Sequence, residues 1–216
     1  MEEPRQDRRL GRRYRDLVIG LLGFGVSIAL MAAAGIGMSP WETFHQGLAR
    51  VTGLPMGTVS ILVAVPAILL WLPLGARPGP GTFLNMAIVG TTTNLILPHL
   101  PHPEALPLQL AMFGAGLAIT GVVVGLYLAA DLGPGPRDGL FTALHRRTGW
   151  RIAWVRTGIE AAALGAGWLL GGKVGLGTIV LVVSIGPITE RSLKVFDRDG
   201  RVMRRRASPA RMEVVP

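Results

Sequence analysis

The chain has 216 residues, of which 50% are hydrophobic and 16% charged, with a formal net charge of +9 and no cysteine. This composition is too apolar for an ordinary soluble domain and indicates a protein that lies in a lipid bilayer. Disulfides and thiolate metal sites are excluded because cysteine is absent. The basic residues lie in the two tails and in one loop between apolar runs, outside any nucleic-acid-binding motif, so we expect anionic lipids and not nucleic acid as their partners.

Six apolar segments alternate along the chain with turns and with two short polar segments. A transmembrane helix needs about 20 apolar residues to cross a hydrocarbon core of about 30 Å. In chain order, the predicted spans are residues 17–38, 56–74, 82–97, 108–131, 152–170 and 174–192. Residues 39–52 and 136–148 are too short to cross, and we predict that they form short helices after the first and fourth spans. We expect His45 and His145 on these short helices to face lipid headgroups.

The second half of the chain repeats the first half at a distance of 96 residues, without a gap between Gly20 and Asn94. The matches fall on residues with special backbone or packing properties: Gly37 with Gly133, Pro40 with Pro136, Gly53 with Gly149, Gly81 with Gly177, Gly90 with Gly186 and Thr93 with Thr189. Each half holds three predicted spans, and because three is odd, the second half must enter the membrane from the opposite side. The sequence therefore predicts an all-α polytopic membrane protein with six transmembrane helices in two inverted three-helix repeats, each with a short helix after its first span.

The positions of the basic residues predict the orientation of the spans, because cytoplasmic loops of membrane proteins are enriched in arginine and lysine. With both termini cytoplasmic, only Arg50 and Lys173 fall on the opposite side. We therefore predict a multi-pass protein of the bacterial inner membrane. Its parts are a basic cytoplasmic tail (1–16), a first repeat (17–97), an external loop (98–107), a second repeat (108–193) and a second basic cytoplasmic tail (194–216) that is partly disordered beyond Arg201.

Two pairs of residues at corresponding positions of the repeats are the first candidates for a substrate-binding or gating site. Trp41 and Glu42 follow the first predicted span, and Arg137 and Asp138 take the corresponding places in the second half. Transporters built from inverted repeats bind their solute between such paired interruptions, so Glu42 and Asp138 are candidate gate carboxylates for a cation, a proton or an amine-bearing solute. In the alternative interpretation, Ser39 and Glu42 form a capping box that serves only the short helix.

A second pair of interruptions lies in the third and sixth predicted spans. Thr93 and Asn94 correspond to Thr189 and Glu190, and these polar residues loosen the ends of their helices and leave backbone groups in need of partners. We predict that these four residues also bind or gate the solute. A solvated helix end is an equally good explanation of Glu190.

Arg156 and Glu160 lie one helical turn apart inside the fifth predicted span, where the first half has the uncharged Ser60 and Ala64. A charge inside a membrane is costly and by default indicates a function, so we predict that this pair couples the movement of solute or protons. A purely structural ion pair at this spacing is the alternative. No catalytic constellation, metal cluster or cofactor motif accompanies these residues, so we expect neither an enzyme nor a bound metal or cofactor.

Three motifs carry a resemblance to a known family. They are Gly35-x-Gly37-x-Ser39-Pro40-Trp41-Glu42 at the end of the first span, the run from Leu132 to Leu140 in mid-chain, and Gly177-Thr178 followed by Gly186-Pro187 in the last span. Over about residues 10–195 the chain resembles the bacterial YczE-type integral membrane proteins of the wider YitT/YczE group. This resemblance implies an inner-membrane protein and a possible transporter, and it indicates no substrate.

Together these patterns predict an inner-membrane transporter or channel for a small solute, with its site between the two inverted repeats. The alternative is a non-transporting accessory or scaffold protein that modulates another membrane complex or binds lipid. Such a protein would have buried, fully satisfied polar groups and no continuous cavity between its halves. The expected partners are the bilayer, including its anionic lipids, and the solute, and the sequence leaves a homo-oligomer open.

Overall fold

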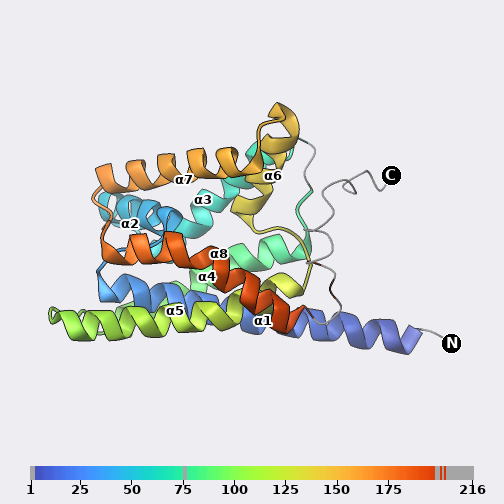
Figure 1. Cartoon of the computed structure of the whole chain (residues 1–216), viewed down its shortest axis with the longest axis horizontal. Coiled ribbons are helices and arrows are strands. Elements are labelled where there is room, and N and C mark those ends of the chain that lie inside the picture. The colour runs from blue at the N-terminus through green and yellow to red at the C-terminus, as the bar shows by residue number, and fades with distance from the viewer. Residues whose placement is uncertain (1–2, 75–76, 198–199, 201, 203–216) are drawn as a thin grey trace.

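The computed structural model describes residues 3–74, 77–197, 200 and 202, with side chains from Leu10 onward. Within this part of the chain the fold is helical and has no strand, which confirms the all-α prediction (Figure 1). The elements are α1 (Glu3–Ala34), α2 (Pro40–Thr52), α3 (Met56–Trp71), α4 (Pro80–Ile96), the 3-10 helix η1 (Leu97–His99), α5 (Leu106–Ala129), α6 (Pro136–Thr148), α7 (Ile152–Leu169) and α8 (Leu176–Phe196). The tail for which disorder was predicted, beyond Arg201, lies outside the described residues apart from residue 202.

Two of the described helices are long and apolar enough to cross a membrane by themselves, namely Leu10–Ala34 within α1 and Leu106–Ala129, which is α5. A third span is possible in principle from α2 and α3 together, which meet at an angle of 111° and therefore form either a broken span or a re-entrant loop. Helices α3 and α4 have only 16 and 17 residues. The membrane character of the chain is thus supported, and the arrangement with six spans stays a prediction.

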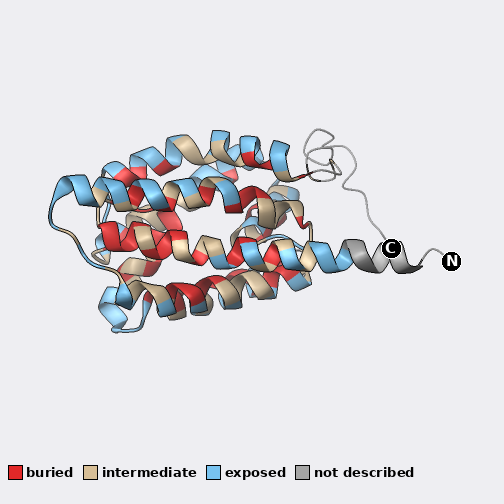
Figure 2. Ribbon diagram, turned by 90° about the horizontal axis from the view of Figure 1, so that it is seen from below, coloured by how far each residue is buried: buried red, intermediate tan, exposed pale blue. Residues whose placement is uncertain are grey.

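The outer surface of the helix bundle is unusually apolar. Figure 2 shows exposed residues along the outward faces of the helices and buried residues between them. Large hydrophobic side chains are among the most exposed, including Leu70 at 61%, Trp154 at 69% and Leu169 at 82%. Extended apolar surface of this kind is rare on soluble monomers and marks contact with a membrane or another protein.

Helices α1 and α5 pack against each other along the long axis of the molecule, and α4 and α8 flank them (Figure 1). Small residues let the two central helices approach closely. A Cβ atom added to Gly20 would lie 2.8 Å from the backbone nitrogen of Tyr127, so only glycine fits there. The buried Thr120 hydroxyl donates a hydrogen bond of 3.1 Å to the Ser27 hydroxyl across the same contact.

The two short helices have matching geometry at positions 96 residues apart. Each has 13 residues, begins with a proline, and ends at a left-handed glycine, Gly53 with φ of 72° and Gly149 with φ of 71°. The linker before each short helix is held by the last helix of the other half. The amide of Gly81 donates to the Leu132 carbonyl at 2.8 Å, and the amide of Gly177 donates to the Ile36 carbonyl at 2.9 Å. The halves are therefore interlocked through corresponding backbone hydrogen bonds.

Helix α2 lies inside the bundle rather than at its surface. It packs against α3 and α7, and six of its residues are buried. His45 is among them, with 5% of its surface exposed, so the expectation that it faces lipid headgroups is wrong. The amphipathic pattern of the segment was compatible with a surface position, but burial against α7 gives its polar face a partner within the protein.

Candidate functional site

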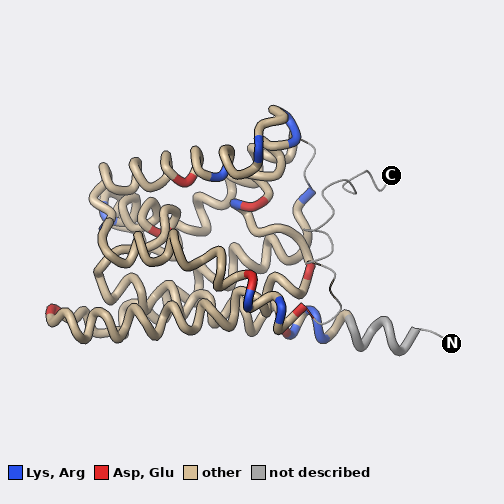
Figure 3. The backbone as a smooth tube through the Cα atoms, viewed as in Figure 1, with Lys and Arg blue, Asp and Glu red and all other residues tan. Residues whose placement is uncertain are grey.

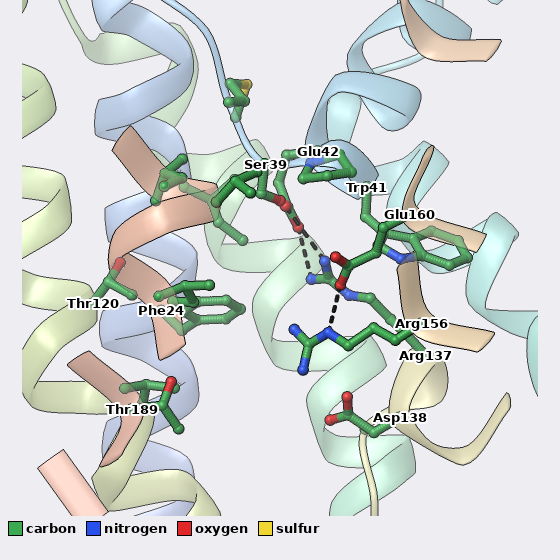
Figure 4. Close-up of a pocket in the computed structure, with 18 of the residues that line it drawn as sticks. Phe24, Ser39, Trp41, Glu42, Thr120, Arg137, Asp138, Arg156, Glu160 and Thr189 are labelled. Carbon is green, nitrogen blue, oxygen red and sulfur yellow. Dashed lines mark hydrogen bonds and ion pairs between the residues drawn. The ribbon is translucent and has the colours of Figure 1, made fainter. Parts of the chain in front are cut away.

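A cavity of about 430 Å³ opens between the two halves of the chain. Every α-helix except α3 contributes residues to its lining, and so do the linkers before α2 and α6. Figure 4 shows the charged residues of this lining gathered around one point. The cavity is therefore shared by both halves and does not belong to either one alone.

The N-termini of α2 and α6 meet at this cavity. The chain must turn sharply after α1 and after α5 to bring them there, and Gly37 (φ of 114°) and Gly133 (φ of 125°) make these turns in a backbone region that favours glycine. Pro40 and Pro136 then start the helices, where a missing N–H costs nothing. The backbone of each linker thus directs the positive end of a short helix toward the cavity.

An ion pair joins the two short helices across the cavity. Glu42 is the third residue of α2 and Arg137 the second residue of α6. The Arg137 guanidinium donates two hydrogen bonds to the Glu42 carboxylate, from Nη2 to Oε1 at 2.7 Å and from Nη1 to Oε2 at 3.4 Å. The Glu42 side chain is only 6% exposed and the Arg137 side chain 31%. A two-point contact of this kind fixes the orientation of both groups.

The ion pair replaces the capping box that the sequence suggested. The Ser39 side chain makes no capping hydrogen bond, and its hydroxyl oxygen is buried without a partner. Glu42 reaches across to Arg137, and no capping hydrogen bond links it to Ser39. The capping-box interpretation is therefore wrong, because a guanidinium within reach offers the carboxylate a charged partner that a backbone amide does not match.

The second ion pair of the cavity lies on α7. The Arg156 Nε donates to Glu160 Oε1 at 2.8 Å, and the Arg156 guanidinium carbon lies 5.8 Å from the centre of the Phe141 ring. The Arg156 side chain is 53% exposed and the Glu160 side chain 26%, so this pair is more exposed than the pair of Glu42 and Arg137. The ion pair named as the structural alternative is present, and both residues line the cavity. Their coupling to the movement of solute or protons stays a prediction.

Asp138 is the one carboxylate of the described lining without a hydrogen bond or ion pair, although its charge attracts the neighbouring Arg137. It is the third residue of α6 and therefore corresponds to Glu42, but no hydrogen bond or ion pair of its carboxylate is found within the described residues. In Figure 4 it lies on the opposite side of the Glu42–Arg137 pair from Ser39. The two equivalent carboxylates thus have different surroundings.

Comparison with known proteins shows to which family the chain belongs. A family model described as a family of unknown function, DUF6198, matches residues 11–194. The uncharacterized membrane protein YczE of Bacillus subtilis is 37% identical over 175 residues, which cover 80% of each chain. An uncharacterized protein of Haemophilus influenzae is 35% identical over 186 residues, covering 84% of each chain. The chain belongs to this family of YczE-type proteins. No solved structure matches it.

Seven of the ten residues that sequence reasoning singled out line the cavity of this YczE-type chain. They are Trp41, Glu42, Arg137, Asp138, Arg156, Glu160 and Thr189. The structure thus brings together the pair after the first span, its counterpart, the charged pair of α7 and one residue of α8.

Thr93, Asn94 and Glu190 lie elsewhere. The Thr93 hydroxyl donates to carbonyls of α4 and α1, at Val89 and Gly25. Asn94 accepts a hydrogen bond of 2.7 Å from the Gly57 amide and donates one of 2.8 Å to the Thr58 hydroxyl. These contacts join α4 to α1 and α3. Glu190 is on the surface of α8, where it pairs with Lys194 at 2.7 Å.

Sequence reasoning missed the contribution of the two central helices to the cavity. Phe24 from α1 and Tyr127 from α5 line it, with ring centres 5.6 Å apart. The sequence gives no sign that these aromatic residues line a cavity, because an aromatic side chain in an apolar span faces lipid as readily as it faces a cavity. Ser27 and Thr120, polar residues in otherwise apolar helices, were the available indication that α1 and α5 face each other.

The described residues contain no group of three or more histidine, aspartate or glutamate side chains placed to hold a metal ion.

Proposed function

We propose that this chain is an inner-membrane transporter or channel for a small solute, with the solute bound in the cavity between two inverted repeats. The observation that carries the proposal is the meeting of the α2 and α6 N-termini at a cavity lined by both halves. Discontinuous helices whose ends point at a solute between two repeats are a recurrent design of secondary transporters. The volume of about 430 Å³ lies at the small end of the range of roughly 300–1,000 Å³ for ligand pockets.

The proposed topology has α1, α3, α4, α5, α7 and α8 as spans, α2 and α6 as re-entrant helices, and both termini in the cytoplasm. The matching of the short helices and of the interlocking hydrogen bonds at a distance of 96 residues supports the repeat. The gathering of basic residues at the end of the bundle where α8 ends and the described side chains of α1 begin supports the orientation (Figure 3).

The accessory-protein alternative is less well supported by the cavity lining. It predicts that buried polar groups are satisfied within the protein. Ser39 Oγ and Trp41 Nε1, which both belong to residues of the lining, are buried without hydrogen-bond partners. Such groups suit a site that a ligand completes.

Cysteine accessibility tests the proposal directly, because the chain contains no cysteine and each introduced thiol is the only one. The test variant is Thr189→Cys in the cavity, and the matched control is Ser192→Cys on the same helix, whose side chain is 5% exposed and contacts α5. A membrane-impermeant thiol reagent is applied to right-side-out and to inside-out vesicles. We expect Thr189→Cys to react from at least one side and Ser192→Cys from neither. A Thr189→Cys thiol that is as unreactive as the control from both sides would reject a solute pathway through this cavity.

A further inference from the structure

The wall of the cavity at α2 contains two buried hydrogen-bond donors that lack acceptors. Trp41 is 9% exposed, and its indole nitrogen, like the Ser39 hydroxyl, is buried without a partner. An indole N–H can only donate, and a buried donor left unpaired is costly. In Figure 4 the nitrogen-bearing edge of the Trp41 ring faces the charged side chains of the cavity. Because these donors lie at the positive end of a helix of 13 residues, they suit an anionic acceptor.

The wall of the cavity at α6 offers the opposite chemistry. The Asp138 carboxylate is exposed at the cavity and can only accept hydrogen bonds when ionised. Its charge attracts the neighbouring Arg137, but it forms no hydrogen bond or ion pair within the described chain. It therefore suits a cationic donor such as an ammonium group.

The remaining charges of the lining cancel. Glu42 pairs with Arg137 and Glu160 with Arg156, which leaves the single negative charge of Asp138. The two helix N-termini that meet here contribute about half a positive charge each. The site as a whole is therefore close to neutral, and a ligand that carries a net charge would leave one wall uncompensated.

The rest of the lining is apolar. It includes Phe24, Ile28, Met31, Val124 and Leu181. We propose that the solute is a zwitterion with an apolar body, of the amino-acid class, whose carboxylate contacts Ser39 and Trp41 and whose ammonium group contacts Asp138. This inference rests on the proposed function, because it assigns the solute of the same cavity.

Phenylalanine and three of its derivatives test which charges the site requires in its ligand. The probes are phenylalanine, phenylalanine amide as the cation, N-acetyl-phenylalanine as the anion, and N-acetyl-phenylalanine amide as the neutral form. The full chain in detergent is heated with each probe while tryptophan fluorescence is recorded. We expect only phenylalanine to raise the unfolding midpoint, by about 5–10 °C at about 100 times its Kd. An equal or larger shift with any other form, or no shift with any form, overturns the assignment.

Matched variants test the two contacts through the binding of radiolabelled phenylalanine. Trp41→Phe keeps the ring and removes the donor, and Asp138→Asn keeps the shape and removes the charge. Each should weaken binding by about 10-fold or more, as expected for a hydrogen bond to a charged group. The control for the first is Trp71→Phe, which removes an indole N–H that is also buried and unpartnered but lies outside the cavity. The control for the second is Glu104→Gln in an exposed loop. Both controls should bind as the parent does, and equal losses in test and control variants would contradict the assigned contacts.

Failure of this inference is distinguishable from failure of the proposed function. If Thr189→Cys reacts from one side of the membrane but no phenylalanine form binds, the cavity is a pathway and the zwitterion is wrong. If phenylalanine binds and also slows the labelling of Thr189→Cys, the ligand lies in this cavity. Labelling that bound phenylalanine leaves unchanged would place its site elsewhere and overturn the assignment.

Discussion

The ion pair between Glu42 and Arg137 is expected to be the strongest single side-chain link between the two short helices. Two unit charges about 4 Å apart interact by about 4 kcal/mol at an effective dielectric constant of about 20. Removing one partner of a fully buried pair costs about 3–5 kcal/mol, because the other charge is left without compensation. Since the Arg137 side chain is 31% exposed, water relieves part of that cost. We expect Glu42→Gln to destabilise the fold by about 2–3 kcal/mol.

The measurement is a double-mutant cycle with Glu42→Gln, Arg137→Gln and the double variant, followed by thermal unfolding in detergent. By the scaling for domains of this size, the single variants should lower the unfolding midpoint by about 4–12 °C. The double variant should lose less than the sum of the two, because it leaves no unpaired buried charge. We expect a coupling free energy of about 2 kcal/mol.

The pair Arg156 and Glu160 is the internal control, because its contact is about as short, at 2.8 Å, and both of its side chains are more exposed. The same cycle on this pair should give a coupling of about 0.3–0.5 kcal/mol, as for exposed pairs one turn apart on a helix. A coupling for Glu42 and Arg137 that is no larger than this control value would refute the reasoning that burial makes the first pair a structural link.

Two further predictions concern packing and topology. Gly167→Ala should lower stability by about 1–3 kcal/mol in thermal unfolding, because its Cβ would lie 2.6 Å from the backbone nitrogen of Phe44 where α7 meets α2. The control is Gly165→Ala on the same helix, whose Cβ would meet nothing within 4 Å and which should raise stability by up to about 1 kcal/mol. Equal effects of the two variants would contradict close packing of α2 on α7. For the six-span topology, an impermeant thiol reagent should label His102→Cys only from outside the cell and Arg77→Cys only from inside, and labelling of both from one side would exclude the proposed inversion.

Much of the fold could be predicted because its determinants are local or repeat along the chain. The bounds of the two short helices depend on a proline at the start and a glycine at the end, and the predicted segment 136–148 coincides with α6. The segment 39–52 differs from α2 only by its first residue. The burial of α2 was not predictable in this way, because an amphipathic helix has the same pattern at a membrane surface and inside a bundle.

Some residues of the candidate site could be predicted from their charge, whereas the helix bounds were predicted from proline and glycine. Charges in an apolar sequence are conspicuous, so Glu42, Asp138, Arg156 and Glu160 were found, and all four line one cavity. The wider criterion of a polar residue in an apolar helix also selected Asn94, whose hydrogen bonds stabilise the contact between α4 and α3. A polar residue in an apolar helix needs a partner, and the sequence does not say whether the partner is another helix or a ligand.

The sequence by itself determined that this chain is an all-helical membrane protein, because hydrophobic length and the order of glycines and prolines are properties of the linear chain. The distance of 96 residues between matching positions is likewise read from the linear chain, and it predicts two corresponding halves. Only the tertiary structure decided that Glu42 forms an ion pair with Arg137 of the other half, and that the donors of Trp41 and Ser39 stay unpaired in the cavity wall. The physical reason is that a side chain takes the best partner within a few ångströms, and which groups lie within that distance is set by how the two halves interlock.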